Sequence, residues 1–253
     1  MTLIILAAGY AVRLQPLTLD TSKSLLPIGG KSMIARILEH VLKVKGISSI
    51  YIITNSKFFK NFSDWLKASK HEKKISLICD GTTSNENRLG AIKDLEFVIK
   101  EESIAGDILV VAGDNLFEFD LNSFLKFAAK KDGVSIAVHD IGSIELARNF
   151  GVVKIDADNR VIDFEEKPEK PKSSLISTGI YYFPKDKVAF INEYVKMQNK
   201  LDAPGNYIGW LAKRDKVYGF AFSEDWYDIG NMESYRKADE EYLKKEKNKS
   251  DET

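Results

Sequence analysis

The sequence predicts an α/β fold, because short apolar runs alternate with amphipathic stretches in its first half and strand patterns dominate later. Residues 2–7 (TLIILA) are apolar and rich in β-branched side chains, which is typical of a strand buried on both faces of a sheet. The chain has 253 residues and a hydrophobic fraction of 44%. This is enough for one large domain, or for a main domain with a smaller lobe.

The first half repeats a strand–helix unit. After the first strand, helical and strand patterns alternate in this order: 33–44 (helical), 50–54 (strand), 58–69 (helical), 75–79 (strand), 89–100 (helical) and 107–112 (strand). Such alternation predicts right-handed βαβ units around a parallel sheet.

The alternation of strand and helix patterns ends at about residue 134. Strand-like segments separated by turn residues follow, at 134–139, 151–155, 161–165 and 176–183. Helical patterns return at 185–199 and from residue 232 onward. We therefore predict a Rossmann-like three-layer sandwich, with a mostly parallel mixed sheet and a smaller β-rich extension.

No internal repeat or low-complexity linker divides the chain. We expect a single domain over residues 1–241, with a first half of 1–133 and a second half of 134–241. The charged residues 242–253 are assigned to a C-terminal tail, and the last ten of them fit either a tail or the frayed end of the helix that begins near residue 232.

Composition and charge exclude several classes of protein. Thirty-seven basic residues balance 37 acidic ones, so the basic surface that nucleic-acid binding requires is not expected. The apolar stretch 3–8 is too short for a signal peptide, and no segment reaches membrane-spanning length. The single cysteine cannot form an intramolecular disulfide. We expect a cytoplasmic protein that binds neither membrane nor nucleic acid.

The loop after the first strand has little steric bulk and reads AAGYAVR over residues 7–13. Its small residues let a backbone approach a bulky ligand, and exposed amides can bind phosphate oxygens. Arg13 is the strong cation of this loop, and a guanidinium holds two phosphate oxygens well. Neither the dinucleotide fingerprint nor the P-loop pattern is present. These features favour a phosphate-bearing small molecule, with Lys23 as a second cation.

Two segments together resemble the opening of the nucleoside-triphosphate:sugar-1-phosphate nucleotidyltransferase family. They read LAAGYAVRLQPLT from residue 6 and SKSLLPIGGKSMI from residue 22. This family includes glucose-1-phosphate thymidylyltransferases and mannose-1-phosphate guanylyltransferases. Further matches follow in the family's order: VVAGDN at 110–115, FEEKP at 164–168, STGIY at 177–181 and WYDIG at 226–230. The resemblance covers residues 3–235.

The resemblance implies a reaction in which a nucleoside triphosphate and a hexose 1-phosphate, of glucose or mannose, form a nucleotide sugar and pyrophosphate. The first half would bind the nucleotide and the second half the sugar phosphate. The implied catalytic residues are Arg13, Lys23, Asp114 and Asp228, and the two acids among them would hold Mg²⁺. Relatives are often homo-oligomers, so we expect one here.

The remaining implied site residues divide between the two substrates. Besides Arg13 and Lys23, the nucleotide-binding residues would be Leu6, Ala7, Ala8, Gly9 and Gly113, to which we add Asn85 and Arg88. The sugar-phosphate-binding residues would be Gly151, Glu166, Lys167, Thr178 and Gly179. Elementary chemistry agrees, because Mg²⁺ prefers hard oxygen ligands and in-line phosphoryl chemistry needs positioning and charge neutralisation.

The chain also departs from the family's pattern. Ala11 replaces the usual second glycine of the first loop, and Asn231 replaces the threonine after Gly230. Over residues 80–95, the family usually has a glutamine and a glycine-rich turn that help to read the nucleobase. Here the quartet 85–88 (NENR) could bind a base edge, contact the triphosphate or cap the next helix. The identity of the base stays open.

Three rival interpretations remain. A cytidylyltransferase acting on phosphocholine or another phosphorylated alcohol shares the opening motif, although the EKP and WYDIG segments favour a sugar. A regulatory subunit that senses nucleotide sugars without catalysis would be expected to lose some of the four catalytic residues. A dehydrogenase lacks support, because the dinucleotide fingerprint is missing.

Overall fold

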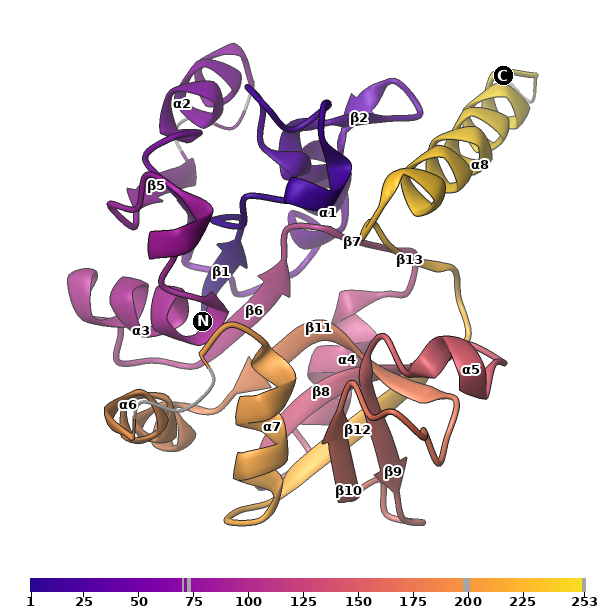
Figure 1. Cartoon of the computed structure of the whole chain (residues 1–253). Coiled ribbons are helices and arrows are strands. Elements are labelled where there is room, and N and C mark those ends of the chain that lie inside the picture. Colours follow the sequence, from indigo (N-terminus) through magenta and orange to yellow (C-terminus); the bar gives the residue numbers. More distant parts are fainter. Residues whose placement is uncertain (70, 72–73, 198–200, 252–253) are drawn as a thin grey trace.

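The computed structural model describes residues 1–69, 71, 74–197 and 201–251. Within these residues, a nine-stranded mixed sheet forms the centre of the molecule, with helices on both faces (Figure 1). Its strands are β1 (Thr2–Leu6), β4 (Ser49–Thr54), β5 (Ile75–Cys79), β6 (Ile108–Ala112), β8 (Val134–Asp140), β9 (Gly151–Ile155), β10 (Val161–Glu166), β11 (Leu175–Phe183) and β12 (Val217–Phe222).

The first half contributes the parallel part of this sheet. β1 pairs in parallel with β4 and β6, and β4 pairs in parallel with β5. Consecutive residues of β1 enter different cores: Leu3 and Ile5 face one side of the sheet, and Ile4 faces the other. This explains the uninterrupted apolar run, because a strand covered on both faces has no polar side.

Two groups of helices supply the outer layers. One core contains side chains from α1 (Met33–Val41), α2 (Phe59–Ala68) and α4 (Leu121–Ala128). The other core contains side chains from α3 (Ala91–Glu101), α6 (Ala189–Lys196) and α7 (Pro204–Ala212). The expected three-layer α/β architecture is therefore confirmed.

The second half extends the sheet in mixed directions. β11 runs antiparallel to β6 and also pairs with β8 and β9, while β9 and β10 form an antiparallel pair. β12 pairs in parallel with β8, and the short α5 (Ile144–Ala147) lies between β8 and β9 in the chain. Because β11 joins β6 directly, the two halves share one sheet.

Two small strand pairs and the last helix complete the fold. β13 (Trp226–Asp228) pairs with β7 (Asn115–Phe117), which brings the end of the second half back to the first. A hairpin of β2 (Pro27–Ile28) and β3 (Lys31–Ser32) lies beside α8 (Met232–Asp251) in Figure 1.

The C-terminal boundary differs from the expectation. The predicted tail from residue 242 continues α8 without a break as far as Asp251. The physical reason is that Tyr242 is only 5% exposed and that Lys245 and Glu246 form ion pairs with the body of the protein. The helix predicted over 185–199 is shorter, since α6 covers Ala189–Lys196, and residues 198–199 of that prediction lie outside the described residues.

None of the helices in the described part of the chain combines the length and the apolar character that crossing a membrane requires.

Candidate active site

The loop after β1 lies at the edge of the sheet where parallel strands end. The Gly113 N–H, directly after β6, donates to the Leu6 carbonyl at 2.8 Å. A Cβ atom at Gly113 would lie 2.9 Å from both that oxygen and the Ser24 hydroxyl. Glycine is therefore required for the loop beyond β1, the end of β6 and the Lys23 segment to meet, and ligands bind at such crevices in open α/β sheets.

Hydrogen bonds from β4 and from the segments after β4 and β5 fix this loop. The Asn55 side-chain amide donates to the Ala8 carbonyl at 2.8 Å, and the Ala7 N–H donates to Ile53 at 2.9 Å. The Tyr10 hydroxyl lies 3.0 Å from the Thr82 hydroxyl. Gly9, between these fixed points, is exposed.

Ala11 occupies the left-handed backbone region, with φ 47° and ψ 44°. This conformation favours glycine, which explains why a glycine is usual at this position and why alanine is strained here. The Thr18 hydroxyl donates to the Ala11 carbonyl at 2.9 Å and helps to fix the turn. The exposed Arg13 follows in a short 3-10 turn, Val12–Leu14.

Lys23 and Asp114 form the central ion pair of the site. The Lys23 Nζ donates to Asp114 Oδ2 at 2.6 Å and to the Ile229 carbonyl at 2.9 Å. Lys23 comes from the 3-10 turn Lys23–Leu25, Asp114 from the turn after β6, and Ile229 from the segment after β13. Although burial acts to raise it, the Lys23 ammonium holds the pKa of Asp114 below its usual value.

Asp228 lies beside this pair. In the β13–β7 ladder it stands opposite Asn115, and the following Ile229 N–H donates to the Asp114 carbonyl at 3.2 Å. Burial and the charge of Asp114 raise the pKa of Asp228 to about 6, while Lys23, Arg13 and Lys167 act in the opposite direction. Of the four residues predicted as catalytic, the contacts bring Lys23, Asp114 and the Asp228 segment together, and the charge of Arg13 acts on Asp228.

Gly179 lies directly behind the acids. Its φ is +77°, and a Cβ atom there would lie 3.0 Å from the Ala112 Cβ and 3.4 Å from the Asn115 Nδ2. That Asn115 amide donates to Asp114 Oδ1 at 2.8 Å. Gly179 therefore contributes space for the group that orients Asp114, a role that its position in a strand did not indicate.

The predicted sugar-phosphate residues lie mainly around β10. The half-buried Glu166 carboxylate has no hydrogen-bond or ion-pair partner among the described residues, and burial raises its pKa. Its Oε2 lies 1.8 Å from where a Cβ atom of Gly205 would stand and 3.0 Å from where one of Gly151 would stand. A cavity of about 370 Å³ is lined by Phe164, Glu166, Tyr194, Gly205, Asn206, Gly209, Trp210 and Lys213.

The two other predicted residues of this group behave differently. Lys167 is exposed with φ 47°, its N–H donates to Phe150, and its charge reaches both Asp228 and Asp202. Thr178 is only 1% exposed, and its hydroxyl donates to the Ala137 carbonyl at 3.0 Å. The Thr178 side chain is therefore hydrogen-bonded to the neighbouring strand β8 within the sheet.

The quartet 85–88 is occupied by contacts within the protein. Ser84 and Asn87 form a capping box around the short turn Asn85–Asn87. The Arg88 guanidinium makes two hydrogen bonds to Asp202, at 2.9 and 3.0 Å, and a third to the Asn85 carbonyl. Three roles were open for this quartet, and the contacts show capping. The capped element is the turn Asn85–Asn87 itself and not α3, which begins at Ala91.

Two buried acids near this region lacked a sequence motif. Asp80, directly after β5, accepts from the Thr82 N–H at 2.7 Å and from its hydroxyl. Asp94, in the first turn of α3, is 6% exposed, and its Oδ1 has no hydrogen-bond partner among the residues that the structure describes. Burial, then the charges of Asp80 and Asp202, raise the pKa of Asp94 to about 8. A polar residue in an apolar helix face was the signal that could have revealed Asp94.

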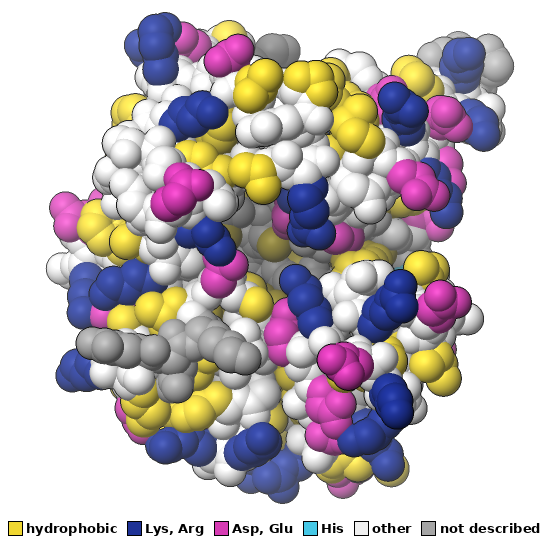
Figure 2. Space-filling model, in the orientation of Figure 1, with side chains coloured by type: hydrophobic (Ala, Val, Ile, Leu, Met, Phe, Trp, Pro, Cys, Tyr) yellow, Lys and Arg dark blue, Asp and Glu magenta, His cyan; other side chains and the backbone are white. Residues whose placement is uncertain are grey.

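The face of the molecule that Figure 2 shows is hollowed at its centre, between its upper and lower parts. Basic and acidic side chains lie on both sides of the hollow.

Comparisons with known proteins identify the family of the chain. A family model described as Nucleotidyl transferase matches residues 2–245. Similar curated proteins include the "Bifunctional protein GlmU" of Methanocaldococcus jannaschii, 33% identical over 231 residues, and that of Methanococcus aeolicus, 29% identical over 238 residues. Each alignment covers 91% of this chain but 51% of the relative, so the chain spans about half the length of these relatives.

Solved structures share the fold. A Bacillus anthracis protein described as a glucose-1-phosphate thymidylyltransferase, in complex with sucrose, is 25% identical with a TM-score of 0.81, and the match covers 96% of each chain. A UDP-glucose pyrophosphorylase complexed with UDP-glucose is 21% identical, also with a TM-score of 0.81, over 96% of this chain and 98% of that one. At this identity the second likeness shows the fold alone.

Proposed function

The chain belongs to the nucleotidyl transferase family of enzymes, and from this premise we propose that it joins a nucleoside monophosphate to a sugar 1-phosphate. The substrates would be a nucleoside triphosphate and a hexose 1-phosphate, and the products a nucleotide sugar and pyrophosphate. The observation that carries the proposal is the cluster of Lys23, Asp114 and Asp228 beside a glycine-containing loop.

The proposed reaction is an in-line substitution at phosphorus. A phosphate oxygen of the sugar 1-phosphate forms a bond to the α-phosphorus, the bond to the β-phosphate bridging oxygen breaks, and pyrophosphate leaves with the electron pair. The chain has to orient two anions and neutralise the charge on the leaving group. The backbone of residues 6–9 and Gly113 would hold the triphosphate, and Arg13 and Lys23 would stabilise the departing pyrophosphate.

Asp114 and Asp228 would hold Mg²⁺. Two carboxylates together with phosphate oxygens and water form the ligand set that this ion prefers. Burial, and then the charge of Asp114 beside it, raise the pKa of Asp228, and a bound cation would offset both effects. When bound, Mg²⁺ supplies charge neutralisation to the carboxylates and phosphate oxygens.

The acceptor would bind on the side of β10. Lys167 carries a charge within reach of Asp228 and would hold the acceptor phosphate. The Glu166 carboxylate, which has no partner among the described residues, lies beside Trp210 and Asn206 in the same cavity. It suits hydrogen bonding to sugar hydroxyls, and Trp210 suits packing against a sugar ring. These features favour a hexose, glucose or mannose, over phosphocholine.

The direct test is release of pyrophosphate with Mg²⁺ across five nucleoside triphosphates and a panel of acceptors that includes phosphocholine. We expect one base and one hexose 1-phosphate to be used best. Release with phosphocholine alone would replace the sugar proposal. Nucleotide-sugar binding without any pyrophosphate release would support a regulatory role instead.

Asp114→Asn is the matching variant. It keeps the shape of the side chain and removes the charge, so we expect turnover to fall by at least about 100-fold. The melting temperature should fall by several degrees, because the one amide oxygen can accept from Lys23 while the amide nitrogen, a donor, replaces the oxygen that accepts from Asn115. Turnover is therefore compared at a temperature where the variant is folded. Near-normal turnover of the folded variant would refute the assignment of Asp114.

A further inference from the structure

α8 and the β2–β3 hairpin belong to a closed series of contacts, called the ring below. It runs from Lys23 to Ile229, along α8 to Tyr235, across to Pro27, and back along the chain to Lys23. Lys23 Nζ donates to the Ile229 carbonyl at 2.9 Å, and α8 begins three residues after Ile229. From α8, the Tyr235 hydroxyl donates to the Pro27 carbonyl at 2.8 Å. The Gly29 N–H donates to Asp239 Oδ1 at 2.7 Å. Pro27 lies four residues after Lys23, so the chain itself completes the ring.

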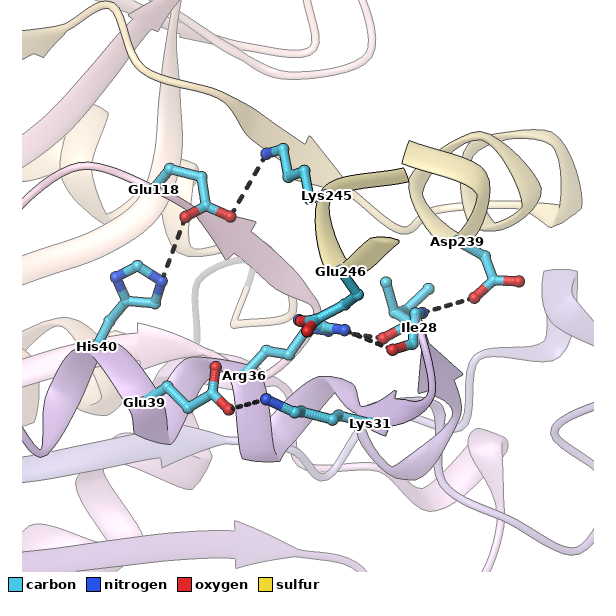
Figure 3. Close-up of polar contacts among 10 residues, drawn as sticks. Ile28, Lys31, Arg36, Glu39, His40, Glu118, Asp239, Lys245 and Glu246 are labelled. Atoms are coloured by element: carbon cyan, nitrogen blue, oxygen red, sulfur yellow. Dashed lines mark hydrogen bonds and ion pairs between the residues drawn. The ribbon is translucent and has the colours of Figure 1, made fainter. Parts of the chain in front are cut away.

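Arg36, on α1, connects the hairpin to α8 (Figure 3). Its Nε donates to the Ile28 carbonyl at 2.6 Å, and one terminal nitrogen donates to the Gly29 carbonyl at 2.7 Å. The other terminal nitrogen lies 3.1 Å from Glu246 Oε1. The guanidinium also stacks over the Tyr242 ring, at 4.3 Å from its centroid. One planar group thus binds two carbonyls of the hairpin and two side chains of α8.

The contact between hairpin and helix is tight enough to transmit a displacement. Gly29 has φ +56°, and a Cβ atom there would lie 2.7 Å from the Tyr242 Cβ and 2.5 Å from the Arg36 guanidinium. Arg36 is 4% exposed and Tyr242 is 5% exposed. Close-packed groups of this kind move together, because little free volume is available to absorb a shift.

The other end of α8 is fixed as firmly. The Ser234 N–H donates to Asn231 Oδ1 at 2.9 Å, and the Gly230 N–H donates to the Ser234 hydroxyl at 3.1 Å. Asn231 therefore acts as the N-cap of α8, a role that the family's usual threonine could also fill. Ile229, fully buried, joins this cap to both Lys23 and Asp114.

We propose that this ring of contacts, in which Arg36 connects the hairpin to α8, positions Lys23 and Asp228 relative to Asp114 for the transfer reaction. The proposal rests on the proposed roles of Lys23 and Asp228. Burying a guanidinium is costly unless its hydrogen bonds are satisfied. Here the contacts of the Arg36 guanidinium attach the β2–β3 hairpin, which follows Lys23, to α8, which follows Asp228.

The first test is hydrogen exchange of the full chain, comparing wild type with Arg36→Met and Arg36→Lys. We expect Arg36→Met to increase exchange at the hairpin 27–32, and also at 226–231, at the far end of α8. Peptides from β4 and β9 should keep their wild-type rates. Arg36→Lys keeps the charge but loses the planar fork, so its exchange should fall between the other two.

The second test separates positioning from stability. For folded Arg36→Met, we expect kcat to fall about tenfold or more while KM for both substrates changes less than about threefold, because misplacement by a fraction of an ångström acts on the chemical step. Lys31→Met is the matched control. Lys31 lies in the same hairpin and pairs with Glu39 of α1 at 2.7 Å, but it is outside the ring. It should leave kcat and exchange at 226–231 unchanged.

If Arg36→Met does not fold, the double variant Tyr235→Phe with Asp239→Ala opens the ring with a smaller loss of packing. The same pattern in exchange and kcat is expected for it. A lower melting temperature with wild-type kcat and wild-type exchange at 226–231 would overturn the proposal. Increased exchange at 226–231 with unchanged kcat would overturn the positioning role. If Lys23→Met and Asp228→Asn both keep full activity, the proposed function fails, whatever the exchange data show.

Discussion

At the scale of single residues, Asp94 is the acid whose environment most opposes its charge. It is 6% exposed, and one of its oxygens has no hydrogen-bond partner in the described part of the chain. Burial, with the charges of Asp80 and Asp202, raises its pKa to about 8. The folded state therefore keeps a proton on Asp94 at pH values where the unfolded chain has released it. By linkage, the free energy of unfolding falls as pH rises from about 4 to 8 on account of this group.

Asp94→Asn should remove this dependence. We expect the variant to gain stability relative to wild type by up to about 1.4 kcal/mol per pH unit between pH 5 and 7, as the linkage relation allows. Urea unfolding at several pH values measures the difference. Asp20→Asn, at an exposed position, should give a constant offset. Parallel stability curves for wild type and Asp94→Asn would contradict the protonated state.

Ala11 carries backbone strain at the first loop. With φ 47°, an alanine pays a steric cost that glycine avoids, although glycine loses more entropy on folding. Ala11→Gly should therefore raise the free energy of unfolding by about 0.5 kcal/mol. Ala35→Gly, within α1, should lower it by about 1 kcal/mol. Loss of stability in both variants would show that the left-handed conformation costs little.

At the scale of elements, the sequence predicted those whose signal is local. β1, β4 and β6 are continuous apolar runs, and α1 and α2 have clear amphipathic periodicity, so each was found within two to three residues. β7 and β13 were missed, because three-residue strands exist only through their pairing with each other. β12, α4 and α7 were also missed, and in α7 the two glycines weaken the helical pattern.

The same distinction holds for the site. Ordered motifs indicated Arg13, Lys23, Asp114 and Asp228, but the contact between Lys23 and Asp114 joins residues 91 positions apart and required the fold. The predicted nucleotide residue Arg88 is paired with Asp202, a partner that no local pattern indicates. Glycines that make space for another side chain, such as Gly205, have no sequence signature.

Gly205 of α7 offers a test of how the helix shapes the acceptor side. A Cβ atom there would lie 1.8 Å from Glu166 Oε2, so alanine has to push this flexible carboxylate aside. We expect Gly205→Ala to raise KM for the sugar 1-phosphate by about tenfold, in line with the loss of one or two hydrogen bonds. KM for the nucleotide and the melting temperature should change little.

The control for this prediction is Gly106→Ala, because the space around Gly106 is open. It should leave both KM values unchanged. An equal rise in both KM values of Gly205→Ala would instead indicate that α7 supports the whole fold rather than the acceptor side.

At the scale of the whole molecule, the two halves of the chain are not separable bodies. β6 of the first half pairs with β1 on one side and with β11 of the second half on the other. β13 and α8 then return to the first half, where β13 pairs with β7 and α8 packs on the β2 hairpin. Unfolding either half would therefore expose a sheet edge and part of a core that belongs to the other.

This connectivity predicts a single cooperative unfolding transition. Trp65 on α2 reports the first half and Trp210 on α7 the second, and Trp226 is the third tryptophan of the chain. In variants that keep one of the first two and replace the others by phenylalanine, the fluorescence midpoint should coincide with that of far-ultraviolet circular dichroism of the same variant. A nucleoside triphosphate with Mg²⁺ should raise both midpoints together, because a ligand that binds only the native state stabilises the whole cooperative unit. If the Trp65 midpoint rose while the Trp210 midpoint stayed fixed, the halves would unfold independently and the shared sheet would not couple them.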